Sequence, residues 1–366
     1  MSRRPANPAA APIRRAARWS RDNLFSSPAN TLLTIACVLA LYWTLPPLAD
    51  WLWRDAVLDA ASRNECREAG SGACWAVVQV RLDQLLYGFY PAAERWRVNL
   101  AFVLLLAALV PVLRARVPGR RWWLTGSLLY PLVAAWLLWG GMGLEPVDSK
   151  RFGGFMLTVL IGVTGIVASL PLGILLALGR RSRLVLLRAA SIGFIELVRG
   201  VPLITLLFVG STLLNYFFPP GTAFDLLFRV FIIVSLFAAA YLAEVIRGGL
   251  AAIPRGQYEA AAAAGLSYYQ TLGLVVLPQA LKISIPGIVN IFIGLYKDTT
   301  LVLIIGLLDP LGISQAILAD AKWQGLSTEL YLFIALGFFA SCFAMSRYSQ
   351  HLERRLSRTS TNTGPD

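Results

Sequence analysis

The stretch EAAAAAGLSYYQTLGLVVLP, residues Glu259–Pro278, decides how this chain is organised. Its five consecutive alanines favour an α-helix. Gly265 is expected to end that helix, because glycine adopts a backbone conformation that a β-carbon would penalise. Ser267 and Gln270 have the spacing of a capping box, so a second helix is expected to start there, and Pro278 is expected to limit or bend it. Because apolar runs lie on both sides, the pattern predicts a rigid helix, turn and helix between two membrane spans.

The composition is that of an integral membrane protein. Of the 366 residues, 57% are hydrophobic and only 14% are charged, and the mean hydropathy is +0.63. A soluble domain of this length needs a much larger charged share to cover its surface. The net charge of +13 does not indicate nucleic-acid binding, because the arginines cluster in short segments between apolar runs, a pattern that sets membrane orientation. We therefore predict an all-α integral membrane protein.

About eight apolar runs are long enough to cross a bilayer as helices, which takes about 20 residues. The first run is interpreted as an uncleaved span, because its apolar core is long for a signal peptide and no small-x-small cleavage site follows. Every second connecting segment is rich in arginine, which predicts that both termini, and the segment quoted above, lie in the cytoplasm. The runs are Thr31–Trp53, Trp96–Leu113, Trp122–Leu144, Gly153–Gly179, Val201–Phe218, Phe224–Arg247, Ile283–Leu308 and Glu329–Tyr348.

The residues needed for catalysis or metal binding are scarce. The single histidine, His351, argues against a histidine-dependent nucleophile and against a multi-histidine metal site. The four cysteines, Cys37, Cys66, Cys74 and Cys342, include no CxxC pair, so a zinc site is not expected. No Gly-Lys dipeptide occurs, so the chain has no P-loop, and any ATP must be hydrolysed by another chain. We expect no catalytic residue, no metal and no cofactor bound by this chain.

Cys66 and Cys74 lie in the same external segment. On the oxidising side of the membrane they could form a disulfide that closes a short loop. Two free thiols are the alternative, and the sequence leaves both open because it does not give the Cα separation that a disulfide requires.

The quoted stretch follows the pattern E-A-A, three residues, G, nine residues, V-x-L-P. This pattern resembles the EAA loop of bacterial ABC importer permeases, with a valine at 275 where isoleucine is usual. FIELVRGVPL (194–203), AYLAEVIRGGLAAIPRGQYEAA (240–261) and LYKDTTLVLIIG (295–306) resemble the polar amino-acid subgroup, the histidine/glutamine-type permeases. The N-terminal spans and CWAVVQVRLDQLLYGFYPAAERWRV (74–98) resemble the longer M-type permease subunit of general L-amino-acid transport systems.

This resemblance implies a bacterial inner-membrane protein that works in a complex. Two ATP-binding subunits would use the ATP, and a periplasmic amino-acid-binding protein would deliver the substrate. A second permease subunit would complete the path, and the extra N-terminal spans suggest that it is a different chain. The loop would dock on an ATP-binding subunit, so the resemblance assigns the ATPase-coupling contact to Glu259, Ala260, Ala261, Gly265, Leu277 and Pro278.

The resemblance and the span pattern together predict the domain organisation. We expect a disordered basic cytoplasmic N-terminus at 1–28; three extra transmembrane helices at 29–151, with a long periplasmic segment at about 54–95; a permease core of five helices at 152–350, containing the cytoplasmic coupling loop at 253–282; and a cytoplasmic tail at 351–366.

Lys297 and Asp298 fall in the middle of the seventh predicted span. A charge at the bilayer centre costs at least ~2.5 kcal/mol on insertion scales, so such residues usually pair or line a wet cavity. In one alternative they pair with neighbouring chains and mark a helix break. In the other, they line the translocation path of a zwitterion together with the hydroxyls of Thr299 and Thr300. Adjacent residues point to different helix faces, which favours a broken helix here.

Two pairs of opposite charge have a spacing of three residues: Glu196 with Arg199, and Glu244 with Arg247. On a helix this spacing allows a local ion pair worth ~0.2–0.5 kcal/mol. The alternative is a gate or an ATPase-facing contact that reorganises during transport. We favour the local pair for Glu244 and Arg247. Both alternatives stay open for Glu196 and Arg199, since Pro202 follows them and would kink or start the next span, so these two are also candidate path residues.

Three functions are open to a membrane protein with these features. The first is a permease subunit of an ABC importer for polar or a broad range of L-amino acids. The second is an ion-gradient-driven secondary amino-acid transporter, a class in which inverted repeats are common; no clear repeat occurs here, and the loop would have no role in it. The third is a membrane enzyme, which would need clustered catalytic side chains. The sequence favours the first function. The expected partners include the lipid bilayer but no nucleic acid.

Overall fold

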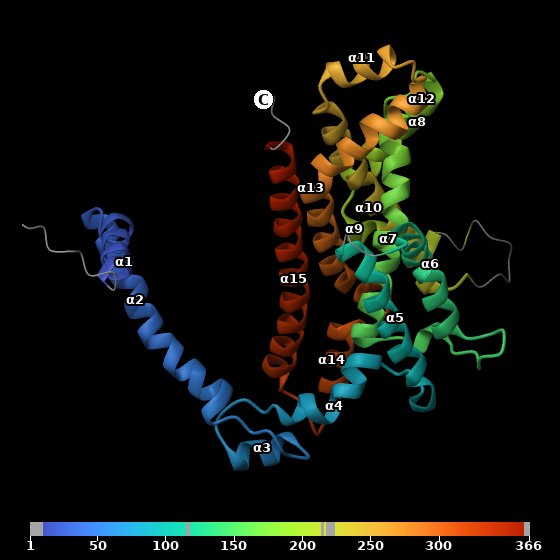
Figure 1. Cartoon of the computed structure of the whole chain (residues 1–366). Helices are drawn as coiled ribbons and strands as arrows, with labels where there is room; N and C mark the ends of the chain where they lie inside the picture. The colour runs from blue at the N-terminus through green and yellow to red at the C-terminus, as the bar shows by residue number, and fades with distance from the viewer. Residues whose placement is uncertain (1–9, 115–117, 214–215, 217–223, 362–366) are drawn as a thin grey trace, which may run out of the picture. The chain divides into compact units, whose positions relative to one another are not determined.

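A computed structural model describes residues 10–114, 118–213, 216 and 224–361 (Figure 1). Regular structure in these residues is helical, apart from three isolated β-bridges. The chain divides into two compact units, Met1–Gln79 and Val80–Asp366. The predicted all-α membrane class is therefore confirmed. Parts of both predicted cytoplasmic ends, residues 1–9 and 362–366, lie outside the described residues.

Unit 1 contains the first span. Helix α2 (Pro28–Ala49) runs on as a π-helical turn, Asp50–Arg54, and together they are long and apolar enough to cross a membrane. Before it, residues that we expected to be disordered form helix α1 (Ala10–Asn23). The reason is compositional: alanine and arginine, which dominate this segment, are both strong helix formers. The predicted disorder is thus not what the structure has over this range.

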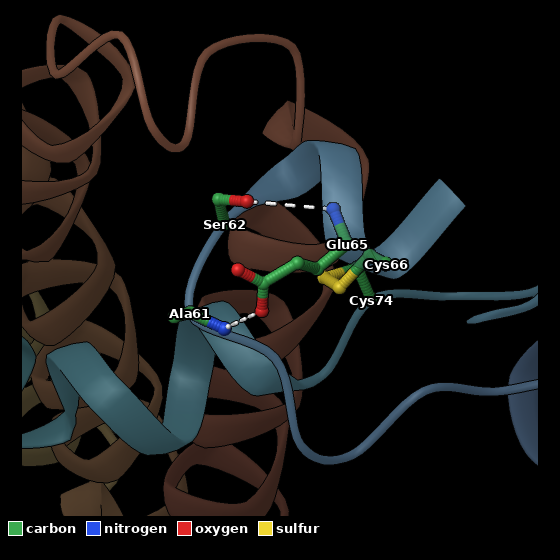
Figure 2. The surroundings of a disulfide bond; sticks show 5 residues. All are labelled: Ala61, Ser62, Glu65, Cys66 and Cys74. Carbon is green, nitrogen blue, oxygen red and sulfur yellow. Dashed lines mark hydrogen bonds between the residues drawn. A yellow bond between two sulfur atoms is a disulfide. The ribbon is translucent and has the colours of Figure 1, made fainter. Parts of the chain in front are cut away.

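A disulfide joins Cys66 and Cys74 in unit 1 (Figure 2). Their Cα atoms lie 5.8 Å apart, and both side chains are buried. Cys66 belongs to the short helix α3 (Arg63–Ala69), where the Glu65 N–H donates to Ser62 Oγ (3.4 Å). The Glu65 carboxylate in turn accepts from the Ala61 N–H (2.7 Å). Of the two alternatives left open by the sequence, the structure has the disulfide, next to a capped helix start.

Unit 2 contains the remaining candidate spans. In the described residues of the whole chain, seven helices are long and apolar enough to cross a membrane, or up to eight if one bent pair counts as a span. This agrees with the prediction of about eight. After α4 (Ala76–Tyr87), the long helices are α5 (Arg95–Leu113), α6 (Arg120–Trp139), α7 (Gly154–Arg180), α10 (Leu226–Ala251), α13 (Leu277–Asp298) and α15 (Ser327–Thr361).

The predicted span Val201–Phe218 is wrong in its boundaries. Instead, α8 (Val185–Gly200) and α9 (Leu203–Leu213) form a pair bent by 109°. Val201 between them is extended (φ −115°, ψ 132°), as expected for a residue before proline, and Pro202 has no N–H to continue the helix. Helix α9 has 11 residues, which reach only about 16 Å. Residues 214–215 and 217–218 of the predicted span lie outside the described residues.

Helix α10 forms the centre of unit 2 and packs against α7, α8, α9 and α13. Small residues allow this close packing. A β-carbon at Gly249 would lie 2.1 Å from Ser284 Oγ of α13, and one at Gly173 of α7 would lie 2.7 Å from Leu242 Cβ. Glycines at such crossings let helices in a membrane approach closely. Helix α6 packs on α7, so it belongs to the same compact unit as the predicted permease core. The predicted boundary at residue 151 stays a prediction.

The two ends of unit 2 carry different short helices. Helix α11 (Arg255–Ala263) lies at the end where α15 finishes, and α14 (Pro310–Leu318) lies at the opposite end (Figure 1). Asp309 begins α14: its Oδ1 accepts from the Gly312 N–H at 2.9 Å, and its side chain is fully buried. Burial raises the pKa of this carboxyl to about 6, although the hydrogen bonds from Gly312 and Leu311 act to lower it.

Candidate functional site

The segment between α10 and α13 begins with helix α11 and a sharp turn. The turn is a Schellman motif: the Gly265 N–H donates to the Ala262 carbonyl (3.0 Å), and the Leu266 N–H donates to the Ala261 carbonyl (3.1 Å). Gly265 has φ +77°, so the prediction that it ends the helix is confirmed. A β-carbon there would meet nothing within 4 Å. Glycine is therefore required at this position because of the positive φ angle, and not because neighbouring atoms leave no room for a side chain.

The second helix starts at the predicted capping box. The Gln270 N–H donates to Ser267 Oγ (3.4 Å), and the Ser267 N–H donates to Gln270 Oε1 (2.9 Å). Pro278 does not end this helix. A π-helical turn, Thr271–Val276, lies directly before α13, so the helix continues through the proline into a candidate span of 38 residues, Tyr268–Ile305. The turn at Gly265 is thus attached directly to a membrane helix.

The six predicted coupling residues differ in exposure. Glu259, Ala260, Gly265 and Pro278 are exposed, and Leu277 is half-buried. Ala261 is only 5% exposed, and α11 packs on the π-helical turn. Within E-A-A, the first two residues are therefore available to a partner, while the third anchors α11.

Polar side chains also fix α11 to the bundle. Gln279 of α13 donates from Nε2 to Gln257 Oε1 at 3.0 Å. At the end of α7, Arg181 donates from Nη1 to the Tyr258 hydroxyl at 3.5 Å and to the Leu250 carbonyl at 3.4 Å. A displacement of α11 would therefore act directly on α7 and α13.

Three exposed apolar side chains beside α11 were not identified from the sequence. Tyr268, Tyr269 and Leu274 are 59%, 82% and 70% exposed. The two tyrosine rings meet edge to face, with centroids 5.6 Å apart. Aromatic side chains are enriched where proteins contact each other. The signal that could have found them is two tyrosines placed directly after the helix cap in an otherwise polar turn.

A cavity of about 260 Å³ lies between α10 and α13. Its polar lining side chains are Tyr241, Asn290 and Asp298, and the rest of the wall is apolar or glycine. Asp298 is therefore the predicted path residue that the structure brings to this cavity, while Lys297 is exposed and does not line it. The complete lining is Phe237, Ala238, Tyr241, Asn290, Ile291, Gly294, Leu295 and Asp298.

The expected helix break next to Asp298 takes a milder form. Helix α13 ends at Asp298 and tightens into a 3₁₀ helix, Thr299–Ile305, without leaving the span. Thr299 Oγ1 donates to the Tyr296 carbonyl (2.8 Å), and Thr300 Oγ1 donates to the Lys297 carbonyl (3.0 Å). Threonine hydroxyls often bond to the preceding turn in this way. Both predicted path hydroxyls are thus engaged with their own helix.

For Glu196 and Arg199 the sequence left open a local pair or a reorganising contact, and among the described residues both side chains pair with other helices. Glu196 Oε1 lies 3.0 Å from Arg180 Nη1 of α7, and Glu244 Oε2 of α10 lies 3.8 Å from Arg199 Nη1. Arg180 at the end of α7 reaches α8 and therefore takes Glu196. The local pair of Glu244 with Arg247 is confirmed, at 2.5 Å.

The structure is a helical membrane bundle that carries a capped turn on a continuous span, and the sequence comparisons identify its class as the membrane component of a transporter. Residues 169–358 match the profile of the binding-protein-dependent transport system inner membrane component. The chain is 49% identical to the glutamate/glutamine/aspartate/asparagine transport system permease protein BztC of Rhodobacter capsulatus, over 94% of each chain. It is 48% identical to the inner membrane amino-acid ABC transporter permease protein YhdY of Escherichia coli, over 98% of this chain and 97% of that protein.

A solved amino acid ABC transporter with histidines is 27% identical, covers 55% of this chain and 91% of its own, and has a TM-score of 0.47. On the sequence matches, the chain belongs to the family of binding-protein-dependent transport system inner membrane components. The resemblance to amino-acid ABC importer permeases is therefore confirmed.

Proposed function

We propose that this chain is a transmembrane permease subunit of an ABC importer for L-amino acids. It would form part of the translocation path and be driven by separate ATP-binding subunits. The observation that carries this proposal is the loop itself, in which a rigid turn with exposed Glu259 and Ala260 continues directly into a membrane span. Family membership supports the same conclusion.

We propose that the exposed side of α11 is the ATPase-coupling contact. Glu259, Ala260 and Gly265 present short or charged groups, so a partner's surface can approach the backbone closely. Tyr269 and Leu274 add exposed apolar area nearby. Ala261 acts differently, because it is buried and holds α11 in place. Leu277 and Pro278 join the loop to α13 and would transmit its displacement.

We propose that the cavity beside Asp298 is part of the substrate path. A carboxylate can pair with the ammonium group of an amino acid. Tyr241 and Asn290 offer a hydroxyl and an amide for further hydrogen bonds. A small, mostly apolar cavity with a few polar groups suits one small zwitterion. The names of the relatives, which include glutamate, glutamine, aspartate and asparagine, support polar substrates or a broad range.

The complete machine would contain two ATP-binding subunits, a second permease subunit of a different sequence and a periplasmic amino-acid-binding protein. The chain would lie in the bacterial inner membrane with both termini in the cytoplasm. It would have no enzymatic activity and bind no cofactor, ATP being used by the partner subunits. The absence of a P-loop supports this division of labour.

The test is reconstitution in proteoliposomes with and without the ATP-binding subunits. Uptake of a labelled amino acid should require ATP, the ATP-binding subunits and the binding protein together. An imposed proton or sodium gradient should not replace them. Uptake by the purified chain alone, driven by an ion gradient, would instead support the secondary transporter.

A further inference from the structure

Three helices meet in an ion cluster at the end of unit 2 that carries α11. The cluster consists of Arg180 from α7, Glu196 and Arg199 from α8, and Glu244 and Arg247 from α10. Glu244 is its centre. One of its carboxylate oxygens lies 3.4 Å from Arg180 Nη1 and 3.8 Å from Arg199 Nη1, and the other lies 2.5 Å from Arg247 Nη2. Glu196 contacts Arg180 at 3.0 Å.

The charges in this cluster do not cancel. Three arginines face two glutamates, which leaves a net charge of +1. The side chains of Glu244 and Arg180 are about one-quarter exposed, whereas that of Glu196 is 54% exposed. Partly buried charges are screened less than surface charges. Glu244 therefore holds together three cations that would otherwise repel one another.

The cluster lies between the cavity and the coupling loop. On one side, the Arg199 guanidinium is 5.5 Å from the ring centre of Tyr241, which lines the cavity. On the other side, Arg181, the neighbour of Arg180, donates to Tyr258 of α11. The Arg199 Nε is buried and has no hydrogen-bond partner among the described residues. Side-chain contacts, linked through the backbone between Arg180 and Arg181, thus join α11 to the cavity wall.

We propose that Glu244 is a positioning residue for transport, which ties the ends of α7, α8 and α10 together so that a displacement of α11 reaches the cavity wall. This inference rests on the proposed function. Arg181 carries the displacement to α7, and Glu244 carries it from α7 to α8 and α10. Without the Glu244 charge, the ATP-binding subunits would still turn over, but their cycle would no longer be passed to the substrate.

The discriminating variant is Glu244→Gln in the reconstituted complex. It keeps the size of the side chain but leaves three arginines facing one glutamate, a net charge of +2. Coupling energies between distant sites typically correspond to 5–150-fold effects. We expect amino-acid uptake to fall about tenfold. The ratio of substrate-stimulated to basal ATP hydrolysis should approach one, while basal hydrolysis is retained.

Two further variants should affect the ratio of stimulated to basal ATP hydrolysis less than Glu244→Gln does. Glu196→Gln removes a single contact with Arg180 and should lower the stimulation ratio less than Glu244→Gln. Asp83→Asn is the matched control: it breaks a 2.6 Å ion pair with Arg95, outside the cluster, and should leave the ratio unchanged. If Glu244→Gln fails to assemble, Arg199→Met removes the longest contact of the cluster, 3.8 Å, and should lower the ratio by itself.

Wild-type uptake and stimulation in Glu244→Gln would overturn the proposal. So would equal losses in Glu244→Gln and Asp83→Asn, because that would reflect general destabilisation. If Arg199→Met is the variant that assembles, an unchanged ratio would overturn it as well. Failure of the proposed function has a different signature: the wild-type complex itself would show no substrate-stimulated hydrolysis.

Discussion

The proposed coupling loop and the ion cluster lie at the same end of unit 2, but they are held in different ways. The loop owes its shape to hydrogen bonds between residues close in sequence, around Gly265 and Ser267. The cluster joins residues far apart in sequence, such as Arg180 and Glu244, through ion pairs between side chains. A short backbone motif is stiff by itself, whereas ion pairs can exchange partners. The difference suggests a rigid contact element attached to an adjustable joint.

The largest effect is expected when the rigid element is broken. Gly265→Pro cannot adopt φ +77°, because proline is restricted to φ near −65°, and it also loses the N–H that bonds to Ala262. We expect uptake and substrate-stimulated ATP hydrolysis to be abolished, while the protein still inserts. Both are measured in proteoliposomes, with membrane insertion followed by immunoblotting.

The control for this variant lies in α11, the helix that the turn at Gly265 ends. Gly256→Ala also adds a β-carbon where nothing lies within 4 Å, but without a positive φ. It should keep wild-type uptake. Wild-type transport by Gly265→Pro would contradict the assignment of the loop.

The packing of α10 against α13 at Gly249 should be the next most sensitive feature. Gly249→Leu places a side chain where even a β-carbon would lie 2.1 Å from Ser284 Oγ, so α10 and α13 must separate. Overpacking of this kind costs about 1–3 kcal/mol. We expect a lower thermal unfolding midpoint in detergent. Gly248→Leu, where a β-carbon meets nothing within 4 Å, should change it little, and equal losses in the two variants would contradict the packing argument.

A substitution in the cavity lining should change the affinity for the substrate. Asp298→Asn removes the carboxylate that lines the cavity while keeping its shape. Hydrogen bonds to charged groups are worth about 1.5–3 kcal/mol, so we expect the KM for uptake to rise about tenfold or more. Basal ATP hydrolysis should not change. An unchanged KM would place the substrate elsewhere.

The smallest effect is expected at the opposite end, at Asp309. The folded state raises the pKa of this carboxyl to about 6, so the unfolded chain loses the proton first as the pH rises. The stability associated with Asp309 is therefore highest below its unfolded pKa and falls as the pH rises to about 6. Asp309→Asn keeps an acceptor for the Gly312 N–H and should flatten this part of the pH profile. The thermal unfolding midpoints of the wild type and Asp309→Asn at pH 4.5 and pH 7 measure this effect. If the midpoint changes equally with pH in both proteins, the burial argument is contradicted.

Features that depend on neighbouring residues could be predicted from the sequence. The turn at Gly265, the capping box at Ser267 and the approximate positions of most spans belong to this group. The break at Pro202 also belongs to this group, because the sequence already predicted that this proline kinks or starts a span. The hydrogen bonds that determine these features form between residues that are close in the sequence.

Features that depend on tertiary packing could not be predicted. Glu196 pairs with Arg180 from another helix and not with Arg199, three residues away. Of the adjacent Ala260 and Ala261, one is exposed and the other buried, which only the packing of α11 decides. Asp298 reaches the cavity while Lys297 does not, because helix rotation relative to α10 is fixed by contacts between helices.

The contrast between Ala260 and Ala261 also gives the most direct test of the coupling loop. Variants with one free cysteine, Ala260→Cys and Ala261→Cys, would be made after replacing Cys37 and Cys342 by serine and keeping the Cys66–Cys74 disulfide. They would be treated with a short crosslinker in the complex with the ATP-binding subunits. Ala260→Cys should crosslink to an ATP-binding subunit, whereas Ala261→Cys, at a position that is 5% exposed, should not. Equal crosslinking at both positions, or none at Ala260→Cys, would contradict the assignment of α11 as the contact with the ATP-binding subunit.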